Sequence, residues 1–271
     1  FTCVAVFNAI RKAGYEPICL DLQESGGLNF TAKSLEECTK KEKKLKVVVV
    51  QNTLGYPCEI EKIKSICEKN NLILIEDLAH CVGTEYENGA EAGTVGDFTV
   101  LSFSQDKIVD AICGGALVVR NNKYSNLDVN IKMQEPKTQI RDRFYPLNTL
   151  KIRLLYGLRV GKIYHSIVKN LGLLTNIMNE SFYNYYKLPP FYAMLANASF
   201  ANLKNQLSHR RKIAEIYAMT LPDKILMFDK NKTQEAVFLS SNLRFPIFVD
   251  NRSVLLNKLK KNGIFLSDIW Y

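Results

Sequence analysis

The stretch LILIED occupies residues 72–77, and its four apolar residues are followed at once by two acids. A short and continuous apolar run is typical of a strand that is buried on both faces of a parallel sheet. The run VVVV at residues 47–50 has the same character, and residues 57–70 place three isoleucines and Cys67 on one helix face. Strand, helix and strand in this order predict that the two runs pair in parallel.

The same alternation continues on both sides of this unit. Residues 17–21 are predicted to form a short strand after a helical stretch that closes at Gly14, and further strands are predicted at 98–103 and 116–119. This part of the chain therefore predicts an α/β fold, in which an open and mostly parallel sheet carries helices on its faces.

The second half of the chain reads mainly as helix. The helical pattern covers residues 123–220, and residues 195–221 predict one long helix. A strand is predicted at 244–249 and a helix at 252–262, which Gly263 closes. These last signals indicate the start of a second and smaller α/β unit.

The change in pattern predicts two domains. Residues 1–200 would form a large domain, which includes the helical segment at 123–190, and residues 201–271 would form an incomplete small C-terminal α/β domain. The chain starts at Phe1 rather than at a methionine and ends on apolar residues without a polar tail. We therefore expect it to be part of a longer protein.

Composition and charge limit the classes of function. The 271 residues are 47% hydrophobic, which is ordinary for a globular protein with a sizeable core. The formal net charge of +9 is compatible with an acidic partner such as a nucleotide, with a membrane surface, or with a basic background. The charge is scattered and no reader motif occurs, so nucleic-acid binding is not expected.

The cysteines and the apolar runs bear on the compartment. The seven cysteines contain no C-x-x-C pair and read as reduced thiols, which favours a cytoplasmic location. No apolar run approaches the ~20 residues that a transmembrane helix needs.

Residues 147–178 are apolar and basic together. Leucines and isoleucines at helical spacing alternate there with five lysines and arginines between Lys151 and Lys169. Such a stretch can pack in a dimer, cover an active site, or lie on a membrane surface, as basic amphipathic helices do. Packing is preferred here, and membrane-surface contact is kept as an alternative.

Polar residues follow the predicted strands directly, at the edge of the sheet where parallel folds bind ligands. Glu76, Asp77 and His80 follow the strand at 72–75, and residues 102–107 follow the next strand. The sequence has no G-x-G-x-x-G and no G-K-[ST], so the phosphate cradles of dinucleotide and P-loop proteins are missing. Asp77 and His80 lack an evident third ligand, so no metal site is predicted.

An acid, a lysine and a hydroxyl together match what pyridoxal phosphate requires. A carboxylate keeps the pyridine nitrogen protonated, a lysine forms the imine and shuttles the proton, and hydroxyls with backbone N–H groups hold the phosphate. Asp77, Lys107 and Ser102 supply these groups from the ends of two strands. Each of them alone more often has a structural role, so the prediction depends on the combination.

Four stretches follow one another in this region with a characteristic order and spacing. They are IEDLAHCVG (75–83), GTVGD (93–97), LSFSQDK (101–107) and GGA (114–116). This series resembles the motifs of the DegT/DnrJ/EryC1/StrS family of sugar aminotransferases. The stretches FTCVAVFNAI (1–10) and RKIAEIY (211–217) are similar to the family as well, so the likeness covers most of the chain.

The resemblance implies the fold type I of pyridoxal phosphate-dependent transferases and a role for five residues. Lys107 would be the Schiff-base lysine, and Asp77 would pair with the pyridine nitrogen. His80 would lie beside the ring, and Ser102 would contact the phosphate. Asn184 is a loose candidate for the residue that reaches the phosphate in the partner subunit.

The resemblance also implies a reaction, which is amino transfer from glutamate to a keto group on a nucleotide-linked sugar by a homodimer. Lys107 would carry the proton between carbons, and it argues against a related dehydratase branch that has histidine there. The aromatic residue that often covers the ring falls at Cys3 in this chain. A non-catalytic homologue that binds a ligand or partner through the same fold is therefore kept as the alternative.

Overall fold

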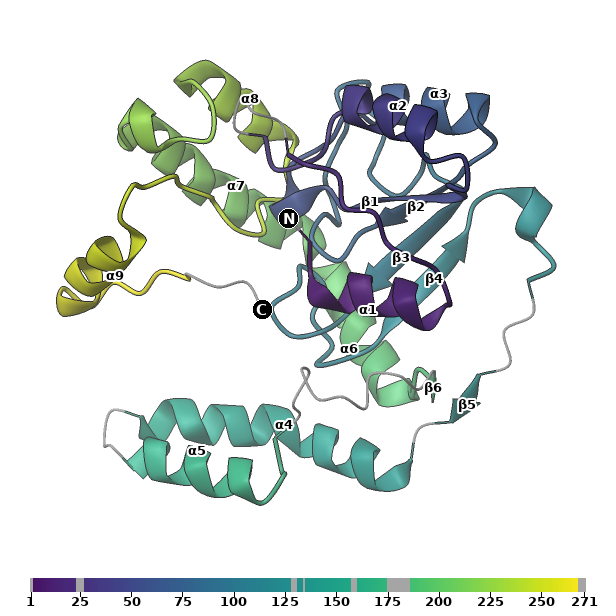
Figure 1. Cartoon of the computed structure of the whole chain (residues 1–271). Coiled ribbons are helices and arrows are strands. Elements are labelled where there is room, and N and C mark those ends of the chain that lie inside the picture. The colour runs from purple at the N-terminus through teal and green to yellow at the C-terminus, as the bar shows by residue number, and fades with distance from the viewer. Residues whose placement is uncertain are drawn as a thin grey trace.

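A four-stranded sheet lies at the centre of the protein (Figure 1). The computed structural model describes residues 2–22, 27–127, 131–133, 135–156, 160–174 and 186–267. The strands lie in the order β1 (Val47–Val50), β2 (Ile73–Asp77), β3 (Phe98–Ser102) and β4 (Gly115–Val119). β1, β2 and β3 are parallel, and β4 is antiparallel to β3. The predicted mostly parallel sheet is therefore confirmed.

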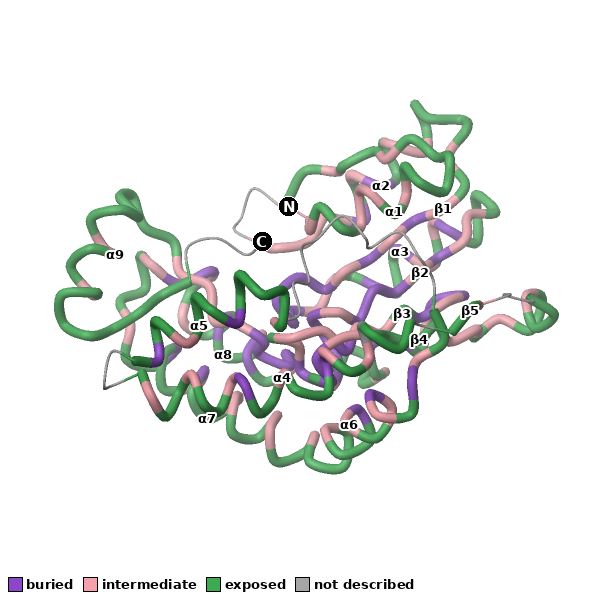
Figure 2. Tube along the Cα trace, turned by 90° about the horizontal axis from the view of Figure 1, so that it is seen from below, coloured by how far each residue is buried: buried purple, intermediate pink, exposed green. Residues whose placement is uncertain are grey.

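Two helices cover one face of this sheet. α2 (Ala32–Lys41) and α3 (Ile60–Lys69) lie side by side over the strands (Figure 1). Their apolar faces enter one core cluster with the strands, in which Leu35, Ile63 and Leu74 are fully buried. Figure 2 shows that the buried residues follow the strands and the loops beyond them. Each such side chain contributes roughly 1.5–3 kcal/mol of transfer free energy, so this core stabilises the packing of α2 and α3 on the sheet.

The stretch GTVGD at residues 93–97 forms a turn around the carboxylate of Glu76. Tyr86 Oη and Gly93 N donate to Oε2 at 2.7 Å each, and Val95 N donates to Oε1 at 2.8 Å. Gly96 N donates to the same oxygen as Val95 N. The side chain of Glu76 is completely buried. This motif residue of β2 therefore has a structural role, because it ties the turn before β3 to the strand that carries Asp77.

Asp97 completes the same connection. Its carboxylate accepts hydrogen bonds from Leu74 N at 2.8 Å and from Asn121 Nδ2 at 2.6 Å, and its backbone N–H donates to the Leu74 carbonyl at 2.8 Å. Hydrogen bonds from two directions fix the entry into β3 against β2.

The remaining described elements are mostly helical. Their bounds are α1 (Val4–Lys12), α4 (Pro136–Leu155), α5 (Val160–Asn170), α6 (Pro190–Ala201), α7 (Leu203–Thr220), α8 (Lys230–Leu239) and α9 (Arg252–Lys261). Three 3-10 turns are η1 (Thr53–Gly55), η2 (Asn122–Tyr124) and η4 (Asp223–Ile225), and a short parallel pair joins β5 (Lys132–Met133) to β6 (Tyr186–Lys187).

The single long helix predicted at 195–221 is wrong. Asn202 separates α6 from α7, with φ −99° and ψ 5°, and its side chain accepts a hydrogen bond from Asn205 Nδ2 at 3.0 Å. The backbone N–H of Asn202 still closes α6 on the Ser199 carbonyl at 3.2 Å, but its ψ of 5° departs from the helical value, so α7 starts in a new direction. The predicted helix at 252–262 is confirmed as α9.

Two predicted strands are also wrong, because neither segment forms the ladder of hydrogen bonds to another strand that defines one in the described residues. Residues 17–21 are irregular, and Ile18 is 47% exposed. Residues 244–249 are irregular, and Phe248 makes one backbone hydrogen bond, to the Ile225 carbonyl at 2.9 Å. The division into domains at residue 200 stays a prediction.

Among the described residues, no helix is long and apolar enough to cross a membrane. The seven cysteines are all free thiols.

Candidate functional site

The candidate site lies at the carboxyl ends of the parallel strands. Asp77 is the last residue of β2 and pairs in register with Val100 of β3. Ser102 is the last residue of β3, and Lys107 lies in the loop that leaves it. The parallel pairing therefore brings the predicted acid, hydroxyl and lysine to one edge of the sheet.

The carboxylate of Asp77 is buried, with 8% of the residue exposed. Its Oδ1 accepts from Ala79 N at 3.0 Å, and its Oδ2 accepts from Gln51 Nε2 at the longer distance of 3.4 Å. Burial raises the pKa of Asp77, whereas these hydrogen bonds and the charge of Lys107 act in the opposite direction. The protonated pyridine nitrogen of pyridoxal phosphate, if bound beside Oδ2, would offset the cost of burying the charged Asp77 carboxylate.

A tight loop presents Lys107. Phe103 N donates to the Gly114 carbonyl at 2.8 Å, and Ala111 N donates back to the Phe103 carbonyl at 2.9 Å, so the two ends of the loop are held together. Asp106, directly before the lysine, has a φ of +65°, which a residue other than glycine rarely adopts. The left-handed backbone of Asp106 costs free energy, and the hydrogen bonds of the surrounding loop maintain it directly before Lys107.

Burial lowers the pKa of Lys107 although most of the charges around it act in the opposite direction. The positive charge of Arg244 lowers this pKa further, while Cys3, Asp77 and Asp106 raise it. Since Lys107 and Asp77 each perturb the pKa of the other, the structure brings together the two residues on which the sequence argument depends. A lysine with a lowered pKa supplies more free amine for nucleophilic attack.

His80 is buried and neutral. Burial, together with the charges of Lys107 and Arg244, lowers the pKa of His80 to about 3. Its Nδ1 accepts a hydrogen bond from Leu54 N at 3.3 Å, so Nε2 of the neutral ring carries the hydrogen. His80 therefore offers a flat and uncharged surface with one donor.

Two buried polar atoms near the site have no hydrogen-bond partner within the described ranges. They are Thr2 Oγ1, next to Cys3, and Gln105 Nε2, two residues before Lys107. A buried polar group without a partner costs free energy unless something else pairs with it. The sequence reasoning missed both residues. With Ser102 at the end of β3 they are the polar groups near the site whose chemistry suits a phosphate, whereas Asn184 lies outside the described residues.

Arg244 was also missed, although it lies close to the site. Ser241 Oγ donates to the His80 carbonyl at 3.0 Å, and Leu243 N donates to the Leu54 carbonyl at 3.1 Å. These bonds attach the segment after α8 to the loops that follow β1 and β2, and so bring Arg244 close enough to influence both His80 and Lys107. Arg244 lies in an irregular segment more than 130 residues after Lys107, so the sequence alone could not predict that it lies near the site.

These residues fit pyridoxal phosphate as a group. A buried carboxylate can pair with the ring nitrogen, a lysine with a lowered pKa can attach to the aldehyde carbon, and unpaired polar atoms can hold the phosphate. No group of three or more histidine, cysteine or acidic side chains suited to a metal occurs in the described part of the chain.

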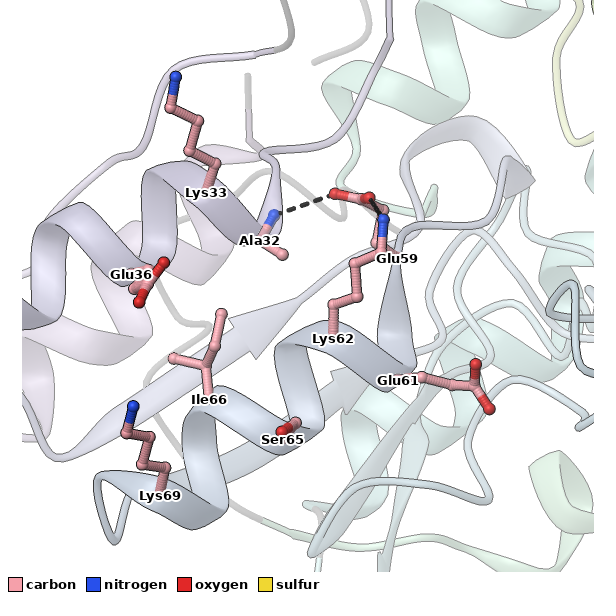
Figure 3. Close-up of a pocket in the computed structure, with 9 residues that line it drawn as sticks. All are labelled: Ala32, Lys33, Glu36, Glu59, Glu61, Lys62, Ser65, Ile66 and Lys69. Carbon is pink, nitrogen blue, oxygen red and sulfur yellow. Dashed lines mark hydrogen bonds and ion pairs between the residues drawn. The ribbon is translucent and has the colours of Figure 1, made fainter.

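A surface groove elsewhere does not belong to this site. It measures about 640 Å³ and lies between α2 and α3, with lysine and glutamate side chains such as Lys33, Glu36 and Lys69 along it (Figure 3). Glu59 at its end accepts from Ala32 N at 3.1 Å. The groove lies between the two helices and contains none of the predicted site residues.

The charge of Arg244 leads to a prediction about pH. In an Arg244→Gln variant the protonated form of Lys107 loses a repulsive neighbour, so the pKa of Lys107 rises. At a fixed pH below that pKa, the free amine becomes scarcer and its reaction slower. We expect the pH profile of Lys107 modification by an amine reagent, followed by mass spectrometry, to shift to higher pH.

A Lys258→Gln variant removes one exposed charge from α9 and serves as the control. It is expected to leave the profile in place. Equal profiles for Arg244→Gln and the parent protein would contradict the electrostatic contact.

The comparisons with known proteins agree with this geometry. The model of the DegT/DnrJ/EryC1/StrS aminotransferase family matches residues 1–271. GDP-perosamine synthase of Vibrio cholerae is 28% identical over 275 residues, which cover 100% of this chain and 64% of the relative. UDP-4-amino-4,6-dideoxy-N-acetyl-beta-L-altrosamine transaminase of Campylobacter jejuni is 29% identical over 158 residues, which cover 58% of this chain and 40% of the relative.

Solved structures show the same fold. A DegT DnrJ EryC1 StrS aminotransferase from Brucella abortus superimposes with a TM-score of 0.66 at 19% identity, over 98% of this chain and 61% of that one. The predicted fold class is therefore confirmed. The chain spans less than two thirds of the length of each of these relatives. With the family model matching from the first residue to the last, the chain belongs to the DegT/DnrJ/EryC1/StrS aminotransferase family.

Proposed function

We propose that the protein of which this chain is part is a pyridoxal phosphate-dependent aminotransferase. It moves an amino group from glutamate to a keto group on a nucleotide-linked sugar. The observation that carries the proposal is the meeting of the buried Asp77 carboxylate and Lys107 at the carboxyl edge of the sheet. Two relatives, a GDP-perosamine synthase and a UDP-amino-sugar transaminase, support the substrate class by their names.

Each residue contributes one part of the chemistry. Bound pyridoxal phosphate supplies an electron sink for the carbon that loses its proton. Asp77 holds the ring nitrogen protonated, since its Oδ2 has one long hydrogen bond and keeps room for another donor. His80 presents its neutral ring beside the cofactor, and Ser102, Thr2 and Gln105 hold the phosphate.

Lys107 moves the proton in both halves of the reaction. Its Nζ, whose pKa is lowered chiefly by burial and also by the charge of Arg244, removes a proton from the carbon of the amino donor. The same Nζ then delivers a proton when the amino group reaches the sugar. An amine with a lowered pKa suits both directions, because proton transfer is most efficient when the pKa lies near the working pH.

A homodimer and a cytoplasmic location belong to the same proposal. The family resemblance supports the dimer, in which Asn184 would reach the phosphate in the partner subunit. The seven free thiols support a reducing compartment.

Spectroscopy of the full-length protein tests the proposed function. After addition of pyridoxal phosphate we expect a visible absorption band, which L-glutamate bleaches and D-glutamate leaves unchanged. Keto sugars linked to GDP or to UDP should then restore the band, and the one that does so identifies the nucleotide. Absence of the band in folded full-length protein would refute the enzyme proposal, and a band that glutamate leaves unchanged would refute glutamate as donor.

One observation supports the second candidate, a homologue that binds a ligand without catalysis. Cys3 replaces the aromatic residue that often covers the ring, and it lies near enough to Lys107 to influence its pKa. A thiol offers less stacking surface than an aromatic ring. Under this alternative, the band forms but neither glutamate nor a keto sugar changes it.

A further inference from the structure

α4 and α5 form a helical hairpin that stands away from the sheet (Figure 1). Tyr164 Oη donates to Asn148 Oδ1 at 2.8 Å between the two helices. Gly161 allows the close approach, because a Cβ there would lie 2.7 Å from the Ile152 carbonyl oxygen. These contacts define which side of each helix faces the other.

The hairpin is attached to the rest of the protein through its one acid. Asp142 is buried, accepts from Arg141 Nε at 2.9 Å, and is also bound by the hydroxyl of Tyr192 on α6. Cys113 Sγ lies 3.8 Å from the same carboxylate, in a weaker contact. Asp142 therefore serves internal contacts and adds no negative charge to the outer surface.

Both helices leave an apolar stripe in contact with solvent. We call the two stripes together the apolar face, and each of its side chains is at least 45% exposed. Its members are Ile140, Phe144, Leu147, Leu150 and Leu154 on α4, and Val160, Ile163, Ile167 and Leu171 on α5. Contiguous apolar surface of this extent is rare on a soluble monomer and marks an interaction site.

The two stripes lie on the same side of the hairpin. At about 100° per residue, each stripe falls roughly a quarter to a third of a turn from the side that faces the other helix. The rotation has the same sense in both helices when each is viewed from its own N-terminus. Because the helices are antiparallel and face each other, the stripes point in the same direction and form one surface.

The charge of the hairpin is almost entirely positive. Residues 136–174 contain eight lysines and arginines and one acid, the buried Asp142. Lys151 and Arg143 are exposed next to the apolar stripe of α4. Among the described residues of α4 and α5 Asp142 is the only acid, and the exposed Glu135 lies just before α4, at its N-cap. A partner for this surface must therefore offer an apolar region that these side chains can enter, together with negative charge.

We propose that the apolar face of the α4–α5 hairpin docks on an anionic membrane surface. The apolar side chains enter the boundary between headgroups and acyl chains, and the basic side chains extend to the phosphates. A second copy of the chain fits less well, because a two-fold interface would place each positive hairpin against an identical one. The hairpin lies on the membrane rather than across it, since neither helix is long and apolar enough to span.

Vesicle flotation of the full-length protein tests the docking. We expect binding to vesicles of phosphatidylcholine with phosphatidylglycerol, weak binding to phosphatidylcholine alone, and less binding as salt rises. An Ile163→Gln/Ile167→Gln variant should bind at least tenfold less, because two apolar side chains no longer gain from leaving water. Arg143→Glu/Lys151→Glu should reduce binding to the anionic vesicles by a similar factor.

Matched changes on other helices separate the hairpin from a general surface effect. Ile216→Gln on α7 replaces a side chain that is 55% exposed, and Lys258→Glu on α9 reverses an exposed charge; both should bind as the parent does. Folding of every variant is checked by circular dichroism. The proposal fails if the folded parent does not bind anionic vesicles, or if the hairpin variants bind as well as it does. It also fails if these variants only convert a dimer to a monomer in light scattering, because a second copy would then cover the face.

Discussion

A Lys107→Ala variant of the full-length protein is expected to lose the visible absorption of bound pyridoxal phosphate and to lose amino transfer. The band requires covalent attachment of the cofactor to Nζ, and the described part of the site holds no second lysine in contact with Asp77. Removal of the proton carrier alone should slow transfer roughly 100- to 10,000-fold. Absorption spectra with added cofactor, and single-turnover assays with glutamate, measure the two losses separately.

Lys107→Arg is the informative companion variant. It retains the positive charge beside Asp77, so the site stays electrostatically balanced, but a guanidinium cannot deprotonate to attach the cofactor. We expect it to fold like the parent and still to lack the band. Lys212→Ala on the exposed side of α7 should behave as the parent. If Lys107→Ala kept both the band and the activity, another residue would have to hold the cofactor.

The largest expected loss of stability comes from Glu76→Gln. Four donors converge on the Glu76 carboxylate, two on each oxygen, and a glutamine amide can accept at one oxygen only. Two buried donors would face an NH₂ group instead, at a cost of about 1–3 kcal/mol each. The free energy of unfolding in guanidinium titrations should therefore fall by roughly 2–6 kcal/mol.

Glu61→Gln makes the same chemical change at an exposed position of α3, where the carboxylate accepts one bond, from Asn88 Nδ2 at 2.8 Å. It should change the free energy of unfolding by less than about 0.5 kcal/mol. A Glu76→Gln protein as stable as the Glu61→Gln protein would show that the turn around Glu76 is not held by its carboxylate.

The strands and the residues that follow them could be predicted because their signals are local. The apolar run at 47–50 coincides with β1, so run length and position predicted the strand bounds closely, although only alternate residues of β1 are fully buried. Strand predictions at 17–21 and 244–249 failed because a strand also requires a neighbour, and whether one is near depends on distant parts of the chain. The break at Asn202 depended on a local change of backbone conformation, with ψ 5°, that helical periodicity does not reveal.

The sequence predicted some residues of the candidate site, and only the structure revealed the others. Asp77, Ser102 and Lys107 follow strands in a recognisable order, so the sequence was sufficient to select them. Arg244 reaches the site through hydrogen bonds from its segment to the loops after β1 and β2. Thr2 and Gln105 were identified only by burial without a partner, which is a property of packing.

By itself, the sequence determined the mostly parallel sheet, the family and the pairing of an acid with a lysine at the sheet edge. These depend on short-range periodicity and on motifs whose spacing the backbone converts directly into position. Only the tertiary structure decided that Glu76 is structural while its neighbour Asp77 lies close enough to Lys107 for each to perturb the pKa of the other, and that the basic helices expose a common apolar face. Those outcomes depend on which groups are buried and on which groups they then contact. Both depend on packing between residues that lie far apart in the chain.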